Sequence, residues 1–176
     1  MAVLGALSVE PMTGYQVHAG IRDVLGNFWT ESFGQIYPTL HQLEADGLVE
    51  RRNGGGSSKA LYAITKPGSA ALKLLLAEPI QPSPQRNGLM LRVFFGRQLG
   101  KAACRRLIEQ AGHDAQAELT RFAQLRAVID ADDQYAKDRP YWLLTVAAGE
   151  HGARAALAWS KEASRTIDSW TAARPR

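Results

Sequence analysis

Three prolines within residues 79–84, Pro79, Pro82 and Pro84, constrain this chain more than any other feature of its sequence. Proline cannot continue a helix, and each proline biases the residue before it toward extended geometry. Short and varied elements are predicted before this segment, whereas apolar residues recur every three or four positions after it, as in long helices. We expect an N-terminal domain over residues 1–78, a proline-rich linker over 79–87 and a helical domain over 88–176.

The composition is that of an ordinary globular protein, because 45% of the 176 residues are hydrophobic and 22% are charged. This balance excludes an intrinsically disordered chain, and the single cysteine, Cys104, excludes a disulfide scaffold. No run approaches the roughly 20 apolar residues of a membrane span. The first residues lack the basic segment of a signal peptide. We therefore expect a cytoplasmic protein without a membrane partner.

The formal net charge of +4 is unevenly distributed. Residues 1–78 hold six basic and seven acidic side chains, a net charge of −1, whereas residues 79–176 hold fifteen basic and ten acidic side chains, a net charge of +5. Net charge supports only non-specific attraction to nucleic acid. A prediction of sequence-specific DNA binding must therefore rest on a motif.

The pattern over residues 1–78 predicts three helices, a β-hairpin and a further helix. The helices are expected over 2–8, 14–25, 34–46 and 66–76, and the strands over 48–53 and 59–64. A glycine-rich tip over 54–58 joins the two strands. This order is the outline of a winged helix-turn-helix, so the fold class is mostly α (α+β), with an N-terminal winged helix-turn-helix and a C-terminal α-helical dimerisation domain.

Local signals place the helix ends in this half. Thr13 and Gln16 have the spacing of a capping box at the start of the second helix. Pro38 is tolerable in the first turn of a helix, so the third helix is expected to start near Gly34 or Gln35. Gly47 stands where a residue with left-handed backbone geometry ends that helix.

Several segments together resemble the PadR family of bacterial transcriptional regulators. The segments are Pro11-Met12-Thr13-Gly14-Tyr15, Phe28-Trp29, Phe33-Gly34-Gln35-Ile36-Tyr37-Pro38-Thr39-Leu40, Leu43-Glu44, Gly47-Leu48-Val49, and Tyr62 with Ile64-Thr65 and Gly68. This resemblance covers residues 1–76 in order. It implies a DNA-binding regulator whose third helix reads the operator.

After the linker, Leu91-Arg92-Val93-Phe94-Phe95-Gly96 resembles the start of the longer, virulence-activator type of C-terminal region in the same family. The resemblance implies that residues 88–176 are helical and form the dimer.

In a winged helix-turn-helix the second helix of the motif enters the major groove, so its outward face carries the DNA contacts. Gln35 and Gln42 are the predicted base readers, because a glutamine amide can pair with adenine at two positions. Tyr37, Thr39 and His41 are the predicted phosphate contacts. His41 departs from the lysine or arginine that the resemblance leads us to expect there. The alternative for this face is an ordinary solvated polar surface.

The hairpin carries three basic side chains around its glycine tip, Arg51, Arg52 and Lys59. As a wing, they are predicted to contact the DNA backbone or the minor groove, where narrow A·T tracts attract arginine. The alternative is a charged hairpin edge that resists aggregation.

The half after the linker has two apolar stripes at helical spacing. The first comprises Leu107, Ala111, Ala115, Leu119, Phe122, Leu125 and Ile129, and the second comprises Trp142, Val146, Gly149, Ala153, Ala156, Ala163, Ile167 and Trp170. The segment 131–133 separates them. Two antiparallel helices cannot bury both stripes alone, so we expect a two-fold homodimer with Leu119, Phe122, Trp142 and Trp170 in its interface.

The resemblance also implies a response to an aromatic or lipophilic compound. Trp159 and Trp142 are the candidate ligand-binding residues, because flat aromatic walls suit planar hydrophobic ligands. The alternative is that these rings fill the core of the dimer.

No pattern indicates an enzyme, a cofactor or a metal site. Residues 54–59 lack the spacing of a phosphate-binding loop. Cys104 has no histidine nearby in sequence to activate it. The four histidines are scattered without metal-ligand spacing: His18, His41, His113 and His151.

Two functions remain open at this point. The leading hypothesis is a homodimeric repressor that binds a palindromic operator in double-stranded DNA and responds to a small-molecule effector. The alternative is a winged-helix adaptor between proteins that no longer binds DNA, which the acidic balance of residues 1–78 and His41 favour.

Overall fold

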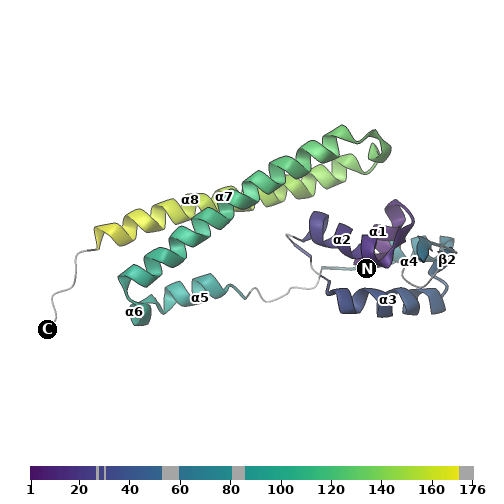
Figure 1. Ribbon diagram of the computed structural model, residues 1–176, viewed down its shortest axis with the longest axis horizontal. Coiled ribbons are helices and arrows are strands. Elements are labelled where there is room, and N and C mark those ends of the chain that lie inside the picture. The colour runs from purple at the N-terminus through teal and green to yellow at the C-terminus, as the bar shows by residue number, and fades with distance from the viewer. Residues whose placement is uncertain (27, 30, 53–59, 81–85, 171–176) are drawn as a thin grey trace. The chain divides into compact units, whose positions relative to one another are not determined.

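The computed structural model describes residues 1–26, 28–29, 31–52, 60–80 and 86–170 (Figure 1). The chain divides into two compact units, Met1–Pro82 and Ser83–Arg176, named here the winged unit and the helical unit. Their boundary lies inside the proline-rich segment. The fold class is confirmed: the chain is mostly α-helical with one small sheet.

The winged unit places its helices around a three-stranded antiparallel sheet of order β1-β3-β2. Its elements are α1 (Ala2–Val9), β1 (Met12–Thr13), α2 (Gly14–Gly20), the π-helical turn η1 (Ile21–Leu25), α3 (Phe33–Ala45), β2 (Val49–Arg52), β3 (Leu61–Ile64) and α4 (Lys66–Ala77). Strand β1 was not predicted, because two residues are too few to show alternation. It pairs Met12 with Tyr62.

Most of the predicted end signals are confirmed. The Thr13 side chain accepts a hydrogen bond from the backbone N–H of Gln16, whose side chain accepts one from the backbone N–H of Thr13. Gly47 has φ of +69°, the left-handed geometry expected after α3. Thr65 caps α4 by accepting from the N–H of Gly68. The helix after Thr13 differs from the prediction, because it widens into η1 at Ile21.

The predicted start of the third helix was one or two residues late. Helix α3 begins at Phe33, so Pro38 is its sixth residue and lies beyond the first turn. Proline removes the hydrogen bond that the carbonyl of Gly34 would accept in a regular helix. Pro38 and Gly34 are both exposed, so water can hydrate that carbonyl and the helix continues through the proline.

The helical unit is built on two long antiparallel helices (Figure 1). Its elements are α5 (Gly88–Phe94), α6 (Gly96–Leu99), α7 (Lys101–Ala131), the 3-10 turn η3 (Asp133–Tyr135) and α8 (Arg139–Ser169). Helices α7 and α8 have 31 residues each, so each is about 45 Å long. The predicted break at 131–133 is confirmed. Within the described residues, no helix combines the length and the apolar character that a membrane crossing requires.

The predicted apolar stripe on α7 is right in its second half and displaced in its first. Ala115, Phe122 and Ile129 are buried as predicted, but before them the buried positions are Cys104, Ile108 and Gly112. Leu107 and Ala111 are half-buried instead. The prediction omitted Cys104, Ile108 and Gly112, of which Gly112 lies opposite Ser160 on α8.

On α8 the predicted Ala156 is exposed, and the polar Ser160 is buried in its place. The Ser160 hydroxyl donates a hydrogen bond to the carbonyl of Leu157 at 3.0 Å, so this buried polar group has a partner on its own helix. A Cβ atom at Gly112 would lie 2.6 Å from Ser160 Oγ, so a larger residue would require the serine side chain to move. Small residues therefore set the helix spacing here.

Polar contacts fix the register of α7 against α8. Lys101 Nζ donates to the carbonyl of Trp170 at 2.7 Å, and Arg105 forms an ion pair with Asp168 at 2.8 Å. Further along, Arg126 bonds Glu150 at 3.0 Å. The start of α7 is thus held to the end of α8, and the last part of α7 is linked to the first half of α8.

Candidate nucleic-acid interface

Helix α3 has a buried face and a polar exposed face. Ile36 and Leu40 are 1% and 0% exposed and pack in the core of the winged unit. These two anchors fix the rotation of the helix and so decide which of its residues face outward. Gln35, His41 and Gln42 are exposed, as a base- or phosphate-contacting face requires.

The two predicted base readers differ in their present partners. Within the described residues the Gln35 amide makes no hydrogen bond, so both its donor and its acceptor are available. The Gln42 amide donates to Asp46 Oδ1 at 2.9 Å. Gln42 must release this carboxylate before it can pair with a base edge.

Tyr37 and Thr39 are half-buried, which makes them poorer phosphate contacts than the sequence suggested. The Tyr37 ring packs over Gly14, where a Cβ atom would lie 2.7 Å from ring carbon Cε1. It also contacts the Phe33 ring edge-to-face, with centroids 5.7 Å apart. Tyr37 therefore fixes α3 against the start of α2, in addition to the contact predicted for it.

His41 has an acidic neighbour on its own helix, because its Nδ1 atom lies 3.7 Å from Glu44 Oε2. The same carboxylate weakens the attraction of this helix face for phosphate.

Two basic residues of the predicted wing, Arg51 and Arg52, lie on opposite faces of strand β2. Arg52 Nε donates to Glu50 Oε1 at 2.9 Å, so this arginine is paired on its own face of strand β2. Arg51 faces the opposite side, across from Tyr62 on β3. Burial raises the pKa of the Tyr62 phenol. Among the described residues, Arg51 forms no ion pair. Lys59 and the tip 54–58 lie outside the described residues.

Sequence reasoning missed the acidic partners of this surface, Glu44, Asp46 and Glu50. Their spacing contained the signal, since Gln42 and Asp46 are four residues apart on a helix and Glu50 and Arg52 are two apart on a strand. The resulting surface offers amides and an imidazole for hydrogen bonding, with its positive charge partly neutralised.

The residues predicted for the dimer interface of the helical unit differ in how far their own chain buries them. Phe122 is 3% exposed and packs with Ile129 and Val146, so its own chain already buries it. Leu119 is half-buried, and Trp170 is 54% exposed. Trp170 is thus the member of this set with the most surface left for a second chain.

The two predicted ligand-binding tryptophans lie in different places. Trp142 packs on the cluster around Phe122, with the Tyr135 ring at 5.2 Å, and Trp159 packs on a separate cluster of Cys104, Ile108 and Ile167. Seventeen residues of helix separate them, about 25 Å along α8. One small ligand cannot contact both rings.

Comparison with known proteins gives the same regulator family over both units. The model of the transcriptional regulator PadR-like family matches residues 3–74, and the model of the virulence activator alpha C-terminal region matches residues 85–168.

Characterised relatives agree with these matches. The chain is 29% identical over 124 residues to the negative transcriptional regulator PadR of Bacillus subtilis, covering 68% of each protein. It is 32% identical over 93 residues to the probable transcriptional regulator Rv1176c of Mycobacterium tuberculosis, covering 51% of this chain and 49% of the relative.

Solved structures share the fold. The PadR-like regulator BC1756 from Bacillus cereus has a TM-score of 0.80 at 22% identity, covering 95% of this chain and 96% of its own. Bacillus subtilis PadR in complex with operator DNA has a TM-score of 0.79 at 22% identity, covering 95% and 97%. The Vibrio cholerae virulence activator AphA has a TM-score of 0.66 at 20% identity, covering 95% and 96%. The chain therefore belongs to the PadR-like family of transcriptional regulators and is not an enzyme.

Proposed function

We propose that this regulator is a homodimeric repressor that binds a palindromic operator through α3 and the wing. The observation that carries the proposal is the α3 face, where exposed Gln35, His41 and Gln42 stand on a helix anchored by Ile36 and Leu40. The negative regulator PadR is a relative of this chain, and PadR has been crystallised with operator DNA, which supports both the repressor role and the binding mode.

The dimer is proposed to form through residues 88–176. Apolar side chains of this unit remain exposed in one chain, among them Phe94 at 82% and Leu144 at 69%. Covering them would contribute about 25 cal/mol for each Å² removed from water. A two-fold dimer also presents two copies of α3 to the two halves of a palindrome.

A small-molecule effector completes the proposal. PadR has been crystallised with p-coumaric acid, an aromatic compound, which supports a response of this class. In this chain Trp159 and Trp142 lie in separate clusters, so each is proposed as part of a different apolar region and not of one shared pocket.

A protein–protein adaptor without DNA binding is the second candidate. The pairing of Gln42 with Asp46 and of Arg52 with Glu50 favours it, because these acids occupy two of the proposed DNA contacts. A mobility shift separates the two functions, using DNA from upstream of the regulator's own gene at 50 and 200 mM salt. Repression predicts a sequence-specific shift that weakens steeply with salt, and an adaptor predicts none.

Substitutions on α3 test the assignment of individual residues. We expect His41→Lys to tighten binding to all sequences several-fold and to steepen the salt dependence by about one charge. His151→Lys on α8 adds the same charge far along the chain and should leave binding unchanged. Gln42→Ala should relax the preference at one base position. If none of these changes alters the binding curves, α3 does not face DNA.

A further inference from the structure

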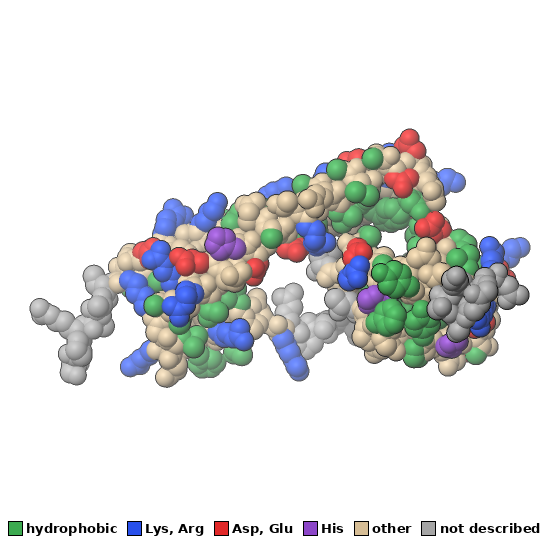
Figure 2. All heavy atoms as spheres, viewed as in Figure 1, with side chains coloured by type: hydrophobic (Ala, Val, Ile, Leu, Met, Phe, Trp, Pro, Cys, Tyr) green, Lys and Arg blue, Asp and Glu red, His purple; other side chains and the backbone are tan. Residues whose placement is uncertain are grey.

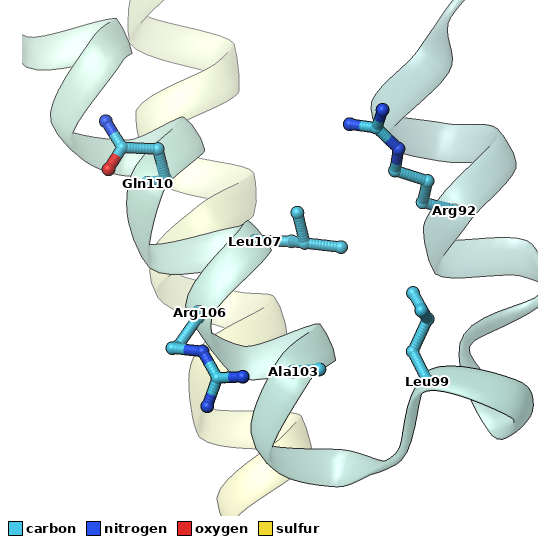
Figure 3. A pocket seen from close by; sticks show the side chains of 6 residues that line it. All are labelled: Arg92, Leu99, Ala103, Arg106, Leu107 and Gln110. Carbon is cyan, nitrogen blue, oxygen red and sulfur yellow. The ribbon is translucent and has the colours of Figure 1, made fainter.

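The unit that carries the proposed DNA contacts is the more acidic of the two. Residues 1–78 have a net charge of −1, against +5 for residues 79–176. Residues 86–108 contain six basic side chains and no acidic one, and Figure 2 shows these blue side chains where α5, α6 and the start of α7 lie. Two of the six, Arg92 and Arg106, line the hollow in Figure 3, where the described lining residues include no acid. The winged unit therefore lacks the excess of positive charge by which a protein binds DNA of any sequence.

Carboxylates hold two of the proposed DNA contacts of the winged unit. On α3 the Gln42 amide donates to Asp46 Oδ1 at 2.9 Å. On strand β2 the Nε and Nη2 atoms of Arg52 both lie 2.9 Å from Glu50 Oε1. Asp46 and Glu50 are exposed, so a DNA phosphate that approaches Gln42 or Arg52 also approaches a carboxylate.

The stability of the fold does not explain these two acids. Asp46 is the C-cap of α3, and no basic residue lies in the last turn of that helix. A negative charge is unfavourable there, because the C-terminal end of a helix itself carries a partial negative charge. The side chains of Arg52 and Glu50 are 57% and 54% exposed, and an ion pair so exposed adds little stability. A role in binding accounts for the positions of both acids better than a role in folding.

A carboxylate distinguishes a base edge from a phosphate. Phosphate oxygens carry negative charge and only accept hydrogen bonds, so they repel a carboxylate and give it no donor. Base edges in the major groove include donors, and a carboxylate can accept a hydrogen bond from the N4 amino group of cytosine. An acid beside a DNA contact therefore penalises phosphate contacts at any sequence, whereas a base edge can offset the penalty.

We propose that Asp46 and Glu50 are specificity-determining residues of operator binding, which weaken the binding of unrelated DNA more than the binding of the operator. The proposal rests on the proposed repressor function. On unrelated DNA, Gln42 and Arg52 meet phosphates alone, so the two carboxylates repel the duplex in every register. At the operator, Gln42 exchanges Asp46 for a base edge, and Arg52 exchanges Glu50 for a narrow A·T minor groove.

Fluorescence anisotropy on the full chain tests the proposal with two labelled duplexes of equal length at about 150 mM salt. One duplex carries the operator found by the mobility shift, and the other carries the same bases in scrambled order. The readout is the specificity ratio, which is the Kd for the scrambled duplex divided by the Kd for the operator. We expect Asp46→Asn and Glu50→Gln each to tighten binding to the scrambled duplex at least fivefold and binding to the operator less than twofold. The specificity ratio therefore falls more than twofold in each variant.

Matched variants separate this role from a general change of charge. Asp23 on η1 forms an exposed ion pair with Arg22, as Glu50 does with Arg52. Asp23→Asn removes the same charge away from α3 and β2, so it should change the specificity ratio less than twofold. Asp46→Glu keeps the charge beside Gln42 and should also change the ratio less than twofold. Circular dichroism establishes that each variant is folded.

Three results would overturn the proposal. Equal tightening on both duplexes would show that the acids only lower the overall attraction for DNA. Unchanged binding to the scrambled duplex would show that they do not repel phosphate. An equal fall of the ratio in Asp23→Asn would show that the position of the acid does not matter.

The unmodified chain keeps this proposal distinguishable from the repressor function. If it shows no preference for the operator over the scrambled duplex, the repressor function is wrong and this proposal with it. If it prefers the operator and all variants keep the same ratio, the repressor function stands and only this proposal is wrong.

Discussion

The two units of this regulator bury their apolar side chains in different ways. In the winged unit eleven buried residues, drawn from helices and strands alike, form a single cluster around Leu40 and Tyr62. In the described part of the helical unit, six buried residues form two separate clusters of three each, one around Ile108 and one around Phe122. The core of the winged unit is therefore complete within one chain. In the helical unit, by contrast, the buried apolar contacts are divided between two small clusters.

This difference indicates that a second chain would add most to the packing of the helical unit. Helical hairpins gain most of their stability from tertiary packing and little from intrinsic propensity. Phe94, Tyr141 and Leu144 are 69% exposed or more in the helical unit. A second copy that covers such side chains would supply the packing that one hairpin lacks. The winged unit has no such requirement for its core.

The largest effect is expected in the continuous core, at Gly68. A Cβ atom there would collide with the backbone carbonyl of Leu48, which accepts hydrogen bonds from Thr65 and cannot move away. We expect Gly68→Ala to lower the free energy of unfolding of the winged unit by about 3 kcal/mol, as overpacking does. Urea denaturation followed by circular dichroism measures it.

Gly34→Ala is the matched control in the same unit. Nothing lies within 4 Å of a Cβ atom at Gly34, and alanine favours a helix by about 1 kcal/mol over glycine. Equal stabilities of the Gly68→Ala and Gly34→Ala proteins would show that the winged core is less closely packed than described.

A smaller effect is expected between the long helices, at Gly149. The Phe122 ring occupies the space that a Cβ atom at Gly149 would need, but this ring belongs to a side chain that can shift. We expect Gly149→Ala to destabilise the helical unit by about 2 kcal/mol. Thermal unfolding of the full chain measures the change.

Gly152→Ala on the same helix has open space around it and should stabilise the unit by up to about 1 kcal/mol. Adding Phe122→Leu to Gly149→Ala should recover part of the loss. If Gly149→Ala and Gly152→Ala behave alike, α7 and α8 are not in close contact at Phe122.

The smallest effect concerns Glu150, which joins α7 to α8. The hydrogen bond from Arg126, followed by that from Arg154, holds the pKa of the Glu150 carboxyl below its usual value. A carboxyl with a lowered pKa in the folded state stabilises the fold above its unfolded pKa, and this contribution is lost as the pH falls through the folded pKa. Stability of the helical unit should therefore decline below about pH 4.3, the ordinary value for glutamate.

Melting temperatures at pH 7 and pH 3.5 test this contribution. Glu150→Gln should show a smaller fall between the two pH values than the unmodified chain, because glutamine does not titrate. Glu162→Gln on the same helix, where the carboxyl has no ion pair among the described residues, should behave as the unmodified chain does. If the melting temperature of Glu150→Gln falls as far between pH 7 and pH 3.5 as that of the unmodified chain, the Arg126–Glu150 pair does not contribute to the pH dependence.

Features that depend on near neighbours could be predicted from the sequence. The Thr13–Gln16 capping box and the left-handed Gly47 each involve residues three or fewer positions apart, and each was predicted at the residue where it occurs. The buried residues Ile36 and Leu40 are four positions apart, which is the spacing of one face of a helix.

Features set by distant partners could not be predicted. The burial of Ser160 depends on Gly112 on the facing helix, and the exposure of Ala156 follows from the same packing. Pro38 continues the helix because its turn faces solvent, which periodicity alone does not show. In the candidate interface, the exposed positions followed from the pattern, but the pairing of Gln42 and Arg52 with acids required side-chain geometry.

Sedimentation velocity tests the central contrast between the two units most directly. The full chain and a fragment of residues 1–78 are compared at the same concentration, with circular dichroism to establish that each is folded. We predict a dimer for the full chain and a folded monomer for residues 1–78, because one chain already closes the core of the winged unit. A dimer formed by residues 1–78, or a monomeric full chain, would contradict this account.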